Sequence, residues 1–428
     1  MRPKRTIASS KKSVKTLQSG AKDTASQKSC GASIHAIRPE LVNVDTNSDV
    51  KSDCATEIDM DSVTDTFNCM SFDNVQRQQS NADNSGDGCW IDDENDADES
   101  DVEDSDDVDR YKILFRLGSG SFGDVHKAYD TKDREYVAIK KIKGIQGINK
   151  KTQRELTILQ HVHVHDPENK YAVKLKDHFS RENQLCMVFE LLSDSLRAAL
   201  GKARRFTMER TRLLGQQLCE ALEFLAKPEV AVIHGDLKPE NIVFHGPDCS
   251  RVKLVDFGIS QFHRKETIYE GIQSRYYRAP EVTLRLPSGH AVDVWSLGCI
   301  LVEMLTGQRL FHASDKTEQM RKIVAVLGPP SRHVLDRARN TATYFDVLPD
   351  GTYTLMKTKS KKRPSLVMMR KLDSILGVRK SGGHGQDGGQ LVKFKDAVLR
   401  MLDYDPQTRV TASQALRHRF FAEYNTMH

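Results

Sequence analysis

Residues 232–244 read VIHGDLKPENIVF and hold chemically active side chains at fixed offsets between two short β-branched stretches. Asp236 is followed by Lys238 and then by Asn241. A carboxylate can accept the proton of an attacking hydroxyl, a lysine can neutralise a transferring phosphoryl group, and an amide oxygen can bind magnesium. The spacing therefore predicts a phosphoryl-transfer site, although a capping aspartate or a loop asparagine would explain each residue taken singly.

A second carboxylate follows in VKLVDFG, residues 252–258, where a predicted strand leads into a turn. This arrangement presents Asp256 as a second magnesium ligand beside Asn241. In phosphoryl transfer a protein mainly positions the reacting groups and stabilises charge. This small set of side chains includes the kinds of group that the reaction needs.

A glycine-rich stretch lies upstream in residues 111–130, where Gly118, Gly120 and Gly123 fit the pattern GxGxxG. Alternating apolar residues on both sides predict strand, turn and strand, whereas a dinucleotide site needs a helix after the glycines. A flexible hairpin over nucleotide phosphates fits this pattern, and a hairpin that uses glycine only for its positive φ is the alternative. The predicted nucleotide contacts are Leu117, Gly118, Ser119, Gly120, Ser121, Phe122, Gly123 and Val125.

The stretch YVAIK, residues 136–140, predicts a strand that ends in Lys140. Residues 149–162 predict a helix that carries Glu155 on its apolar face. A carboxylate on an apolar face needs a cation, so we expect an ion pair with Lys140 that directs the ammonium to the α- and β-phosphates. An exposed lysine is the simpler alternative. The histidines of 161–166 are expected in the turn after this helix, in a solvated loop rather than a metal site.

Residues 185–192, LCMVFELL, predict a buried strand that ends in a hinge between two lobes, from Glu190 to Leu192. An adenine ring would bond to the backbone there. Phe189 would limit the depth of the pocket, although one more core aromatic is an equal interpretation. The predicted nucleotide contacts of this part are Ala138, Lys140, Glu155, Phe189, Glu190, Leu191 and Leu192.

The first quarter of the 428-residue chain has a different composition. Residues 1–109 show almost no apolar period and could not offset chain entropy by burial, so we expect a disordered tail. Residues 1–15 contain six basic and no acidic residues, whereas residues 91–109 contain twelve acidic and no basic ones. The basic start lacks the apolar core of a secretory signal, and it indicates either a nuclear-import patch or a solvated tail.

The eight cysteines form no CxxC pair, which argues against a zinc site and a disulfide scaffold. No apolar run reaches the length of a membrane span, and the nearest, residues 294–305, suits a buried core helix. We therefore expect a soluble intracellular monomer, in the nucleus and/or the cytoplasm, with no membrane contact and no direct nucleic-acid binding.

Taken in order, the glycine flap, strand lysine, helix glutamate, HxDxKxxN, DFG and RAPE motifs resemble the eukaryotic protein kinases over residues 111–422. Arg409 in DPQTR looks like the distal arginine that pairs with Glu281 of APE. Longer stretches are similar to the minibrain-like branch of the dual-specificity tyrosine-regulated kinases, in the CMGC group. These stretches are 272–282, 322–336, 348–364 and 392–406.

The resemblance implies an α+β, bilobal kinase fold after the disordered tail. It implies a β-rich N-lobe with one main helix and a hinge over 110–192, and a mostly helical C-lobe over 193–422. The C-lobe would hold a CMGC-type insert around 326–392, and a short tail would cover 423–428.

The resemblance also implies transfer of the γ-phosphate of ATP, with Mg²⁺, mainly to serine or threonine of protein substrates. Such substrates often carry proline after the acceptor and arginine three residues before it. Asp236 and Lys238 match the catalytic positions, Glu240 the reader of that arginine, and Arg278 the residue that shapes the proline pocket.

The activation loop departs from the family pattern. Relatives autophosphorylate a tyrosine where Gly271 stands here, while Tyr269 is kept. Many kinases also have an arginine, which would bind an activation-loop phosphate, where Gly235 stands. We therefore expect a loop ordered by unmodified contacts, with tyrosine autophosphorylation left open.

The relatives' phosphotyrosine pairs with two arginines that correspond to Arg275 and Arg278. Without that phosphate, we expect nearby carboxylates such as Glu270 or Glu281 to hold them. The alternative function is a pseudokinase scaffold that binds nucleotide or partners without transfer. Pseudokinases usually lose a flap glycine, the strand lysine, the catalytic aspartate or a metal ligand, and none is lost here.

Overall fold

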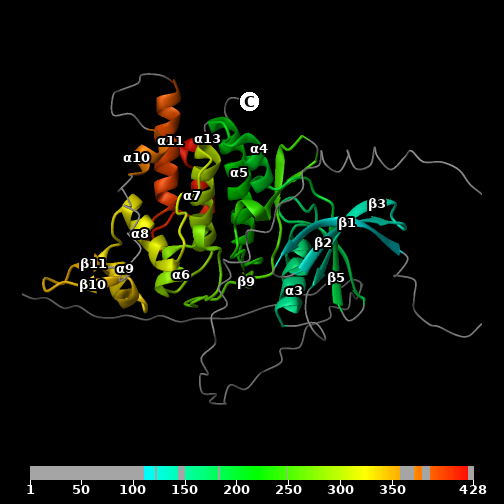
Figure 1. Ribbon diagram of the computed structural model, residues 1–428, viewed down its shortest axis with the longest axis horizontal. Helices are drawn as coiled ribbons and strands as arrows, with labels where there is room; N and C mark the ends of the chain where they lie inside the picture. The colour runs from blue at the N-terminus through cyan, green and yellow to red at the C-terminus, as the bar shows by residue number, and fades with distance from the viewer. Residues whose placement is uncertain are drawn as a thin grey trace, which may run out of the picture. The chain divides into compact units, whose positions relative to one another are not determined.

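The computed structural model describes residues 110–120, 123–142, 150–181, 184–246, 248–356, 371–377 and 386–422. They form a small β-rich lobe and a larger helical lobe, seen at the right and the left of Figure 1. The predicted α+β bilobal fold is confirmed. The predicted tails, 1–109 and 423–428, lie outside the described residues.

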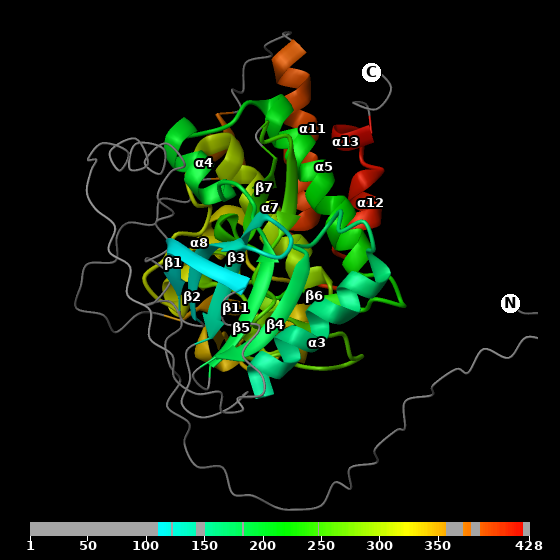
Figure 2. The same cartoon turned by 90° about the vertical axis from the view of Figure 1, so that its right-hand side faces the viewer.

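The small lobe is a five-stranded antiparallel sheet with the strand order β1-β2-β3-β5-β4. Its one long helix, α3, lies beside the sheet in Figure 2. The elements are β1 (Tyr111–Gly120), β2 (Gly123–Asp130), β3 (Glu135–Ile142), α3 (Lys150–His165), β4 (Leu175–Arg181) and β5 (Gln184–Glu190).

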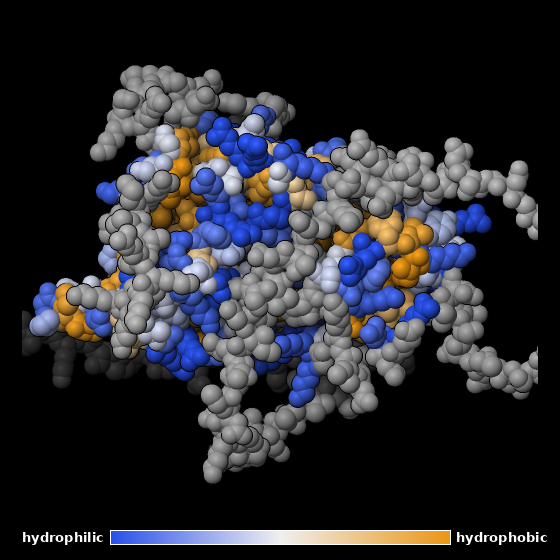
Figure 3. Space-filling model, viewed as in Figure 1, coloured by the Kyte–Doolittle hydropathy of each residue, from blue (hydrophilic) through white to orange (hydrophobic). Residues whose placement is uncertain are grey.

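Residues 185–189 of strand β5 are all apolar and all buried, so both faces of the strand lie in the interior. Cys186 and Val188 pack with Ile139 in one core cluster, whereas Met187 and Phe189 belong to the cluster that continues into the large lobe. Large apolar side chains that stay exposed on this lobe lie on β1 and β3, where Figure 3 shows an apolar patch, and at Val164 near the end of α3. The buried strand places the predicted hinge at the boundary between the two lobes.

The large lobe is built around α7 (Ala291–Thr306), whose residues 292–304 are all buried, as the apolar run predicted. Its first elements are α4 (Leu196–Ala203), α5 (Met208–Leu225), β6 (Val232–Ile233), η2 (Pro239–Asn241), β7 (Ile242–His245), β8 (Arg251–Leu254) and β9 (Gln261–Phe262). Next come η3 (Arg275–Tyr277), α6 (Pro280–Leu284), α7, α8 (Lys316–Leu327), α9 (Arg332–Arg337), η4 (Thr341–Thr343), β10 (Phe345–Val347) and β11 (Tyr353–Leu355). The last are α10 (Leu372–Leu376), α11 (Gln386–Met401), α12 (Ala412–Leu416) and α13 (Arg419–Ala422).

Backbone hydrogen bonds join the two lobes next to the DFG turn. The amide of Val173, before β4, donates to the carbonyl of Leu254 in β8 over 2.9 Å, and the amide of Leu254 donates to the carbonyl of Tyr171 over 2.9 Å. Asp256 follows β8 after one intervening residue, Val255. These bonds therefore fix its turn against the small lobe.

The histidines of 161–166 do not lie in a turn after the helix, so that prediction was wrong. Helix α3 continues through His165. The rings of His161 and His165 are hydrogen-bonded to the carbonyls of Val230 and His161, at 3.0 and 2.9 Å. These contacts stabilise a last turn that histidine propensity alone would leave marginal. In the described residues no helix is both long and apolar enough to cross a membrane.

Candidate active site

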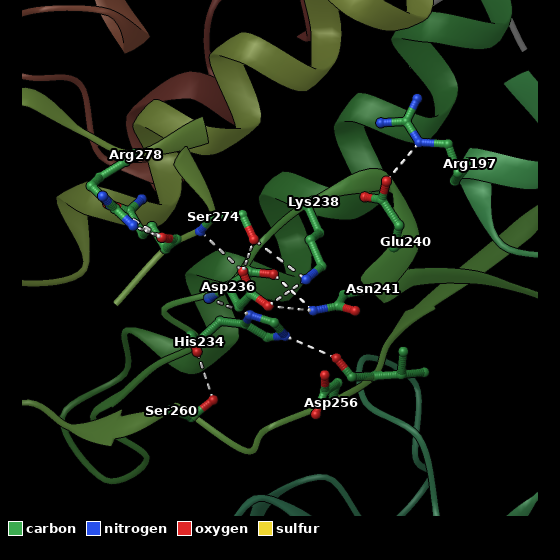
Figure 4. A network of polar contacts seen from close by, with 12 residues as sticks. Arg197, His234, Asp236, Lys238, Glu240, Asn241, Asp256, Ser260, Ser274 and Arg278 are labelled. Atoms are coloured by element: carbon green, nitrogen blue, oxygen red, sulfur yellow. Dashed lines mark hydrogen bonds and ion pairs between the residues drawn. The ribbon is translucent and has the colours of Figure 1, made fainter. Parts of the chain in front are cut away.

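The carboxylate of Asp236 is held by donors on both oxygens (Figure 4). The amide and hydroxyl of Ser274 donate to Oδ1 over 3.1 and 2.8 Å. The ammonium of Lys238 lies 2.8 Å from Oδ2, and the amide of Asn241 donates to the same oxygen over 3.2 Å. The three residues that the spacing predicted are thus brought together. A fourth, Ser274, joins them from the activation segment, the stretch between the DFG and RAPE motifs that contains the activation loop.

A buried carboxylate fixes the backbone of the catalytic loop, the stretch that carries His234, Gly235 and Asp236. Asp293, at the start of α7, accepts hydrogen bonds from the amides of His234 and Gly235 over 2.8 and 3.0 Å. The hydroxyl of Ser260 donates to the carbonyl of His234 over 2.7 Å. Burial raises the pKa of Asp293, and the amide donors only partly offset it.

Gly235 occupies a backbone conformation that suits glycine. Its φ is +75°, and an added Cβ would lie 3.4 Å from the carbonyl oxygen of Ile259. Its carbonyl accepts a 2.6 Å hydrogen bond from the amide of Gln273. The loop therefore contacts the activation segment through its backbone at this position, where many kinases use an arginine side chain.

The predicted ion pair between Lys140 and Glu155 is present. Lys140 Nζ lies 2.6 Å from Glu155 Oε1 and 3.1 Å from Asp256 Oδ1. Burial alone would lower the pKa of Lys140, but the carboxylates of Asp256 and Glu155 outweigh it and keep this pKa above its usual value. The cations of Lys140 and Lys238 likewise keep the pKa of Asp256 low despite burial. The lysine is therefore charged and the Asp256 carboxylate ionised at neutral pH.

The residues predicted to bind magnesium fit such an ion. The amide nitrogen of Asn241 is directed to Asp236, so its amide oxygen faces away from that carboxylate (Figure 4). Asp256 has the unusual φ of +62°, a local strain of the kind found at functional sites. Within the described residues no group of three or more His, Cys, Asp or Glu could hold a metal alone. Magnesium suits this arrangement, because it is usually held by one or two protein ligands together with substrate phosphates.

The glycine-rich stretch forms the β1–β2 hairpin, as predicted. Gly120 pairs with Gly123 across the strands, and an added Cβ on Gly123 would lie only 2.2 Å from the carbonyl of Lys141. Val125 pairs with Lys140 on strand β3, and Ala138 lies two positions before Lys140 on the same strand. Leu117 and Ser119 are described in β1, whereas the predicted contacts Ser121 and Phe122 lie outside the described residues.

At the hinge, Phe189 is buried at the end of β5 and pairs with Ala138. The carboxylate of Glu190 accepts hydrogen bonds from Lys253 Nζ over 2.6 Å and from the amide of Lys174 over 2.7 Å. Leu191 and Leu192 follow in the link to α4. The side chain of Glu190 is thus bound to the large lobe and to the residue before β4, and its backbone amide also donates to the carbonyl of Lys174 over 3.1 Å.

In the activation segment, the hydroxyl of Tyr269 is hydrogen-bonded to the backbone. Tyr269 is buried, its hydroxyl donates to the carbonyl of Phe262 over 3.1 Å, and it accepts from the amide of Arg264 over 2.7 Å. Gly271 has a φ of +69°, and an added Cβ would meet no atom of the described structure within 4 Å. A larger side chain at position 271 would therefore begin in open space, without a contact at its Cβ.

The prediction that Glu270 or Glu281 holds the two arginines of this segment was wrong for both carboxylates. Glu281 is bound by Arg409, as the resemblance implied, and Glu270 lies 3.4 Å from Arg285. The guanidinium of Arg275 instead donates to the carbonyl of Ser314 over 2.5 Å. That of Arg278 donates to the carbonyl of Gln273 over 2.8 Å. Among the described residues, carbonyl oxygens of the segment and of the turn before α8 thus accept from the two arginines.

Gln273 and Ser274 are the site residues that the spacing argument missed. The side chain of Gln273 donates to the carbonyl of Val292 over 2.9 Å and to the hydroxyl of Ser296 over 2.8 Å, and it accepts from the amide of Ala279 over 3.0 Å. Both residues lie just before RAPE, in a stretch whose resemblance to kinases was visible. Their side-chain targets lie in distant segments and could not be read from spacing.

Known proteins resemble this chain in the part just described. The family model of the protein kinase domain matches residues 111–421 of this chain. The chain belongs to the protein kinase family. A Drosophila melanogaster homolog of dual specificity tyrosine-phosphorylation-regulated kinase 3 is 35% identical over 318 residues, which is 72% of this chain and 38% of that relative.

The Caenorhabditis briggsae dual specificity tyrosine-phosphorylation-regulated kinase mbk-2 is 34% identical over 325 residues, which is 73% of this kinase chain and 38% of that relative. The kinase chain thus spans 38% of the length of each of these two relatives. The predicted family of dual-specificity tyrosine-regulated kinases is confirmed, and the narrower minibrain-like branch stays a prediction.

Proposed function

We propose that this chain is an active protein kinase that transfers the γ-phosphate of ATP to serine or threonine of protein substrates. The observation that carries the proposal is the fixed, largely buried carboxylate of Asp236, which Ser274, Lys238 and Asn241 orient. A base with both oxygens directed in this way can accept the proton of a hydroxyl that attacks a phosphoryl group.

The other predicted site residues have distinct roles in the proposed reaction. Lys238 would neutralise charge on the transferring group, and Lys140, fixed by Glu155, would bind the α- and β-phosphates. Asn241 and Asp256 would hold Mg²⁺, which supplies charge neutralisation at the phosphates when it is bound. The β1–β2 hairpin would cover the nucleotide, and the hinge backbone would bind its base. Arg278 is proposed to shape the pocket for a residue after the acceptor.

We further propose that the kinase domain has an N-lobe and hinge over 110–192 and a C-lobe over 193–422, with an insert around 326–392. We propose that it acts as a monomer without direct nucleic-acid contact. The basic side chains near Asp236 are paired with acids, namely Lys238 with Asp236 and Arg197 with Glu240, whereas a nucleic-acid site usually presents a basic stripe.

Transfer of radiolabelled phosphate from ATP to a generic basic protein substrate tests the proposed function. The purified protein should label the substrate, and an Asp236→Asn variant prepared in the same way should not. Binding of nucleotide by both proteins without labelling by either would instead identify a pseudokinase scaffold.

Tyr269→Phe should cost less than about tenfold in kcat/KM, or ~1.4 kcal/mol in the barrier. The hydroxyl of Tyr269 serves the loop through two hydrogen bonds to backbone groups, and the buried ring remains in the variant. Treatment with a tyrosine phosphatase should likewise leave most of the activity. Mass spectrometry that finds stoichiometric phosphate on Tyr269, together with loss of activity when it is removed, would make Tyr269 the switch and contradict this expectation.

We propose nuclear accumulation from two basic clusters, in residues 1–15 and 357–371, nearly all of which lie outside the described residues. Substitution of Lys4, Arg5, Lys11 and Lys12 by alanine should weaken nuclear accumulation of a fluorescent fusion, unless the second cluster is sufficient. Neutralisation of both clusters without any change in localisation would remove the basis of the proposal.

A further inference from the structure

A cluster of opposite charges lies on the α4 side of the catalytic loop. Arg197 Nε donates to Glu240 Oε1 over 2.7 Å, and its Nη1 and Nη2 donate to Glu303 and to the hydroxyl of Tyr277 over 2.8 and 2.7 Å. That hydroxyl donates to the second oxygen of Glu303 over 2.6 Å. Arg309 approaches Glu240 Oε1 to 3.8 Å. Figure 4 shows Arg197 directed at Glu240, with their contact as a dashed line.

Glu240 is nevertheless not fully satisfied. Its Oε2 is buried and has no hydrogen-bond partner among the residues that the structure describes. Its side chain is only 12% exposed, so the carboxylate is largely shielded from solvent. An ionised oxygen in this situation would attract a cationic group of a bound molecule.

Glu240 is within reach of a peptide substrate whose acceptor lies at Asp236. The two residues are four positions apart, and one extended residue spans about 3.3 Å, so they are separated by no more than about 14 Å. A substrate residue two to five positions from the acceptor covers a similar distance. A bare Glu240 carboxylate would therefore select for arginine at one of these substrate positions.

The cluster opposes a preference for substrate arginine, because Arg197 and Arg309 of the chain itself already lie beside the Glu240 carboxylate. Arg197 and Arg309 oppose Glu240 and Glu303, so these four residues have no net negative charge to offer a substrate cation. Burial and then Glu303 keep the pKa of Tyr277 far above neutral pH, so its hydroxyl adds no negative charge. An incoming guanidinium that approached Glu240 Oε2 would meet the positive charges of Arg197 and Arg309, which already lie 2.7 and 3.8 Å from Oε1 of the same carboxylate.

We propose that Arg197, with Arg309, occupies the cation subsite of Glu240 in cis, so that this kinase phosphorylates substrates without selecting an upstream arginine. The proposal rests on the proposed kinase function and replaces the expectation that Glu240 reads a substrate arginine. Arg197 and Arg309 are thus specificity-determining residues that act by filling a substrate position from within the chain.

The test compares peptides that differ in one residue. The parent peptide has one acceptor serine and alanines on its N-terminal side, and each derivative carries a single arginine two to five positions before the serine. Every arginine peptide should have a kcat/KM within about threefold of the parent with the wild-type protein. In the Arg197→Leu, Arg309→Ala double variant, the best arginine peptide should gain about tenfold or more over the parent, which corresponds to ~1.4 kcal/mol.

A tenfold preference of the wild-type protein for an arginine peptide, or an unchanged ratio in the double variant, would overturn the proposal. Because Arg197→Leu leaves Glu303 without its guanidinium, Arg309→Ala is measured alone as well, and it should raise the ratio by a smaller factor. Arg285→Ala is the matched control, since Arg285 pairs with Glu270 instead, and it should leave the ratio unchanged. Absence of transfer to every peptide would refute the proposed kinase function itself, whereas transfer to the parent supports it whatever the ratio.

Discussion

Lys140→Arg and Asp256→Asn should each lower kcat/KM for phosphoryl transfer by about two orders of magnitude or more, while the fold stays nearly intact. The ammonium of Lys140 is a point charge 2.6 Å from Glu155 and 3.1 Å from Asp256, and a planar guanidinium cannot take the same place. Asp256→Asn removes the charge that would hold magnesium. Losses of this size are typical of positioned electrostatic groups, and neither change removes core volume.

Single-turnover transfer assays with purified variants, together with thermal unfolding, measure both parts of this prediction. Lys176→Arg is a matched control, because Lys176 forms a 2.5 Å ion pair with Glu135 at a half-exposed position of the same sheet. The control should keep nearly the wild-type rate. Wild-type rates in both site variants would show that the proposed mechanism is wrong.

Arg409→Met should lower the free energy of unfolding by about 3–5 kcal/mol, because it leaves a buried carboxylate without its cation. Arg409 binds both oxygens of Glu281 over 2.6 and 2.8 Å, and neither side chain has exposed area. The same guanidinium donates to the carbonyls of Asp403 and Ala291, so it joins α6, α7 and the segment before α12. Urea denaturation followed by circular dichroism measures the loss.

Two further variants separate the buried charge from other effects of this substitution. Adding Glu281→Gln to Arg409→Met removes the unpaired charge and should recover part of the lost stability. Arg332→Met breaks an exposed pair with Asp336 and should change stability by less than about 1 kcal/mol. A loss below about 1 kcal/mol in Arg409→Met would contradict the role of this pair.

The contacts that sequence reasoning predicted correctly follow from local patterns. The helix period placed Glu155 on a buried face, and a buried carboxylate needs a cation, so Lys140 could be named as its partner from the sequence alone. The glycine spacing predicted the β1–β2 hairpin in the same way. Each of these predictions needed only the period of one element and the rule that buried charges are paired.

The contacts that could not be predicted depend on which distant segments meet. Carbonyl acceptors for Arg275 come from a turn about forty positions away, and such backbone groups have no signature in the sequence. The last turn of α3 forms because a ring of His161 reaches Val230 of the other lobe. Arg197 reads as an ordinary helix residue until the fold brings it to Glu240.

The hydrogen bonds of Gln273 have a consequence for local unfolding. Its amide donates to Gly235 of the catalytic loop, and its side chain is bonded to Val292 and Ser296 of α7. An opening of the activation segment at this point therefore breaks bonds to the catalytic loop and to the central helix at once. We therefore expect the three segments to open as one cooperative unit, so that a fluctuation that exposes the Gln273 amide to exchange with solvent also releases the loop that carries the proposed base.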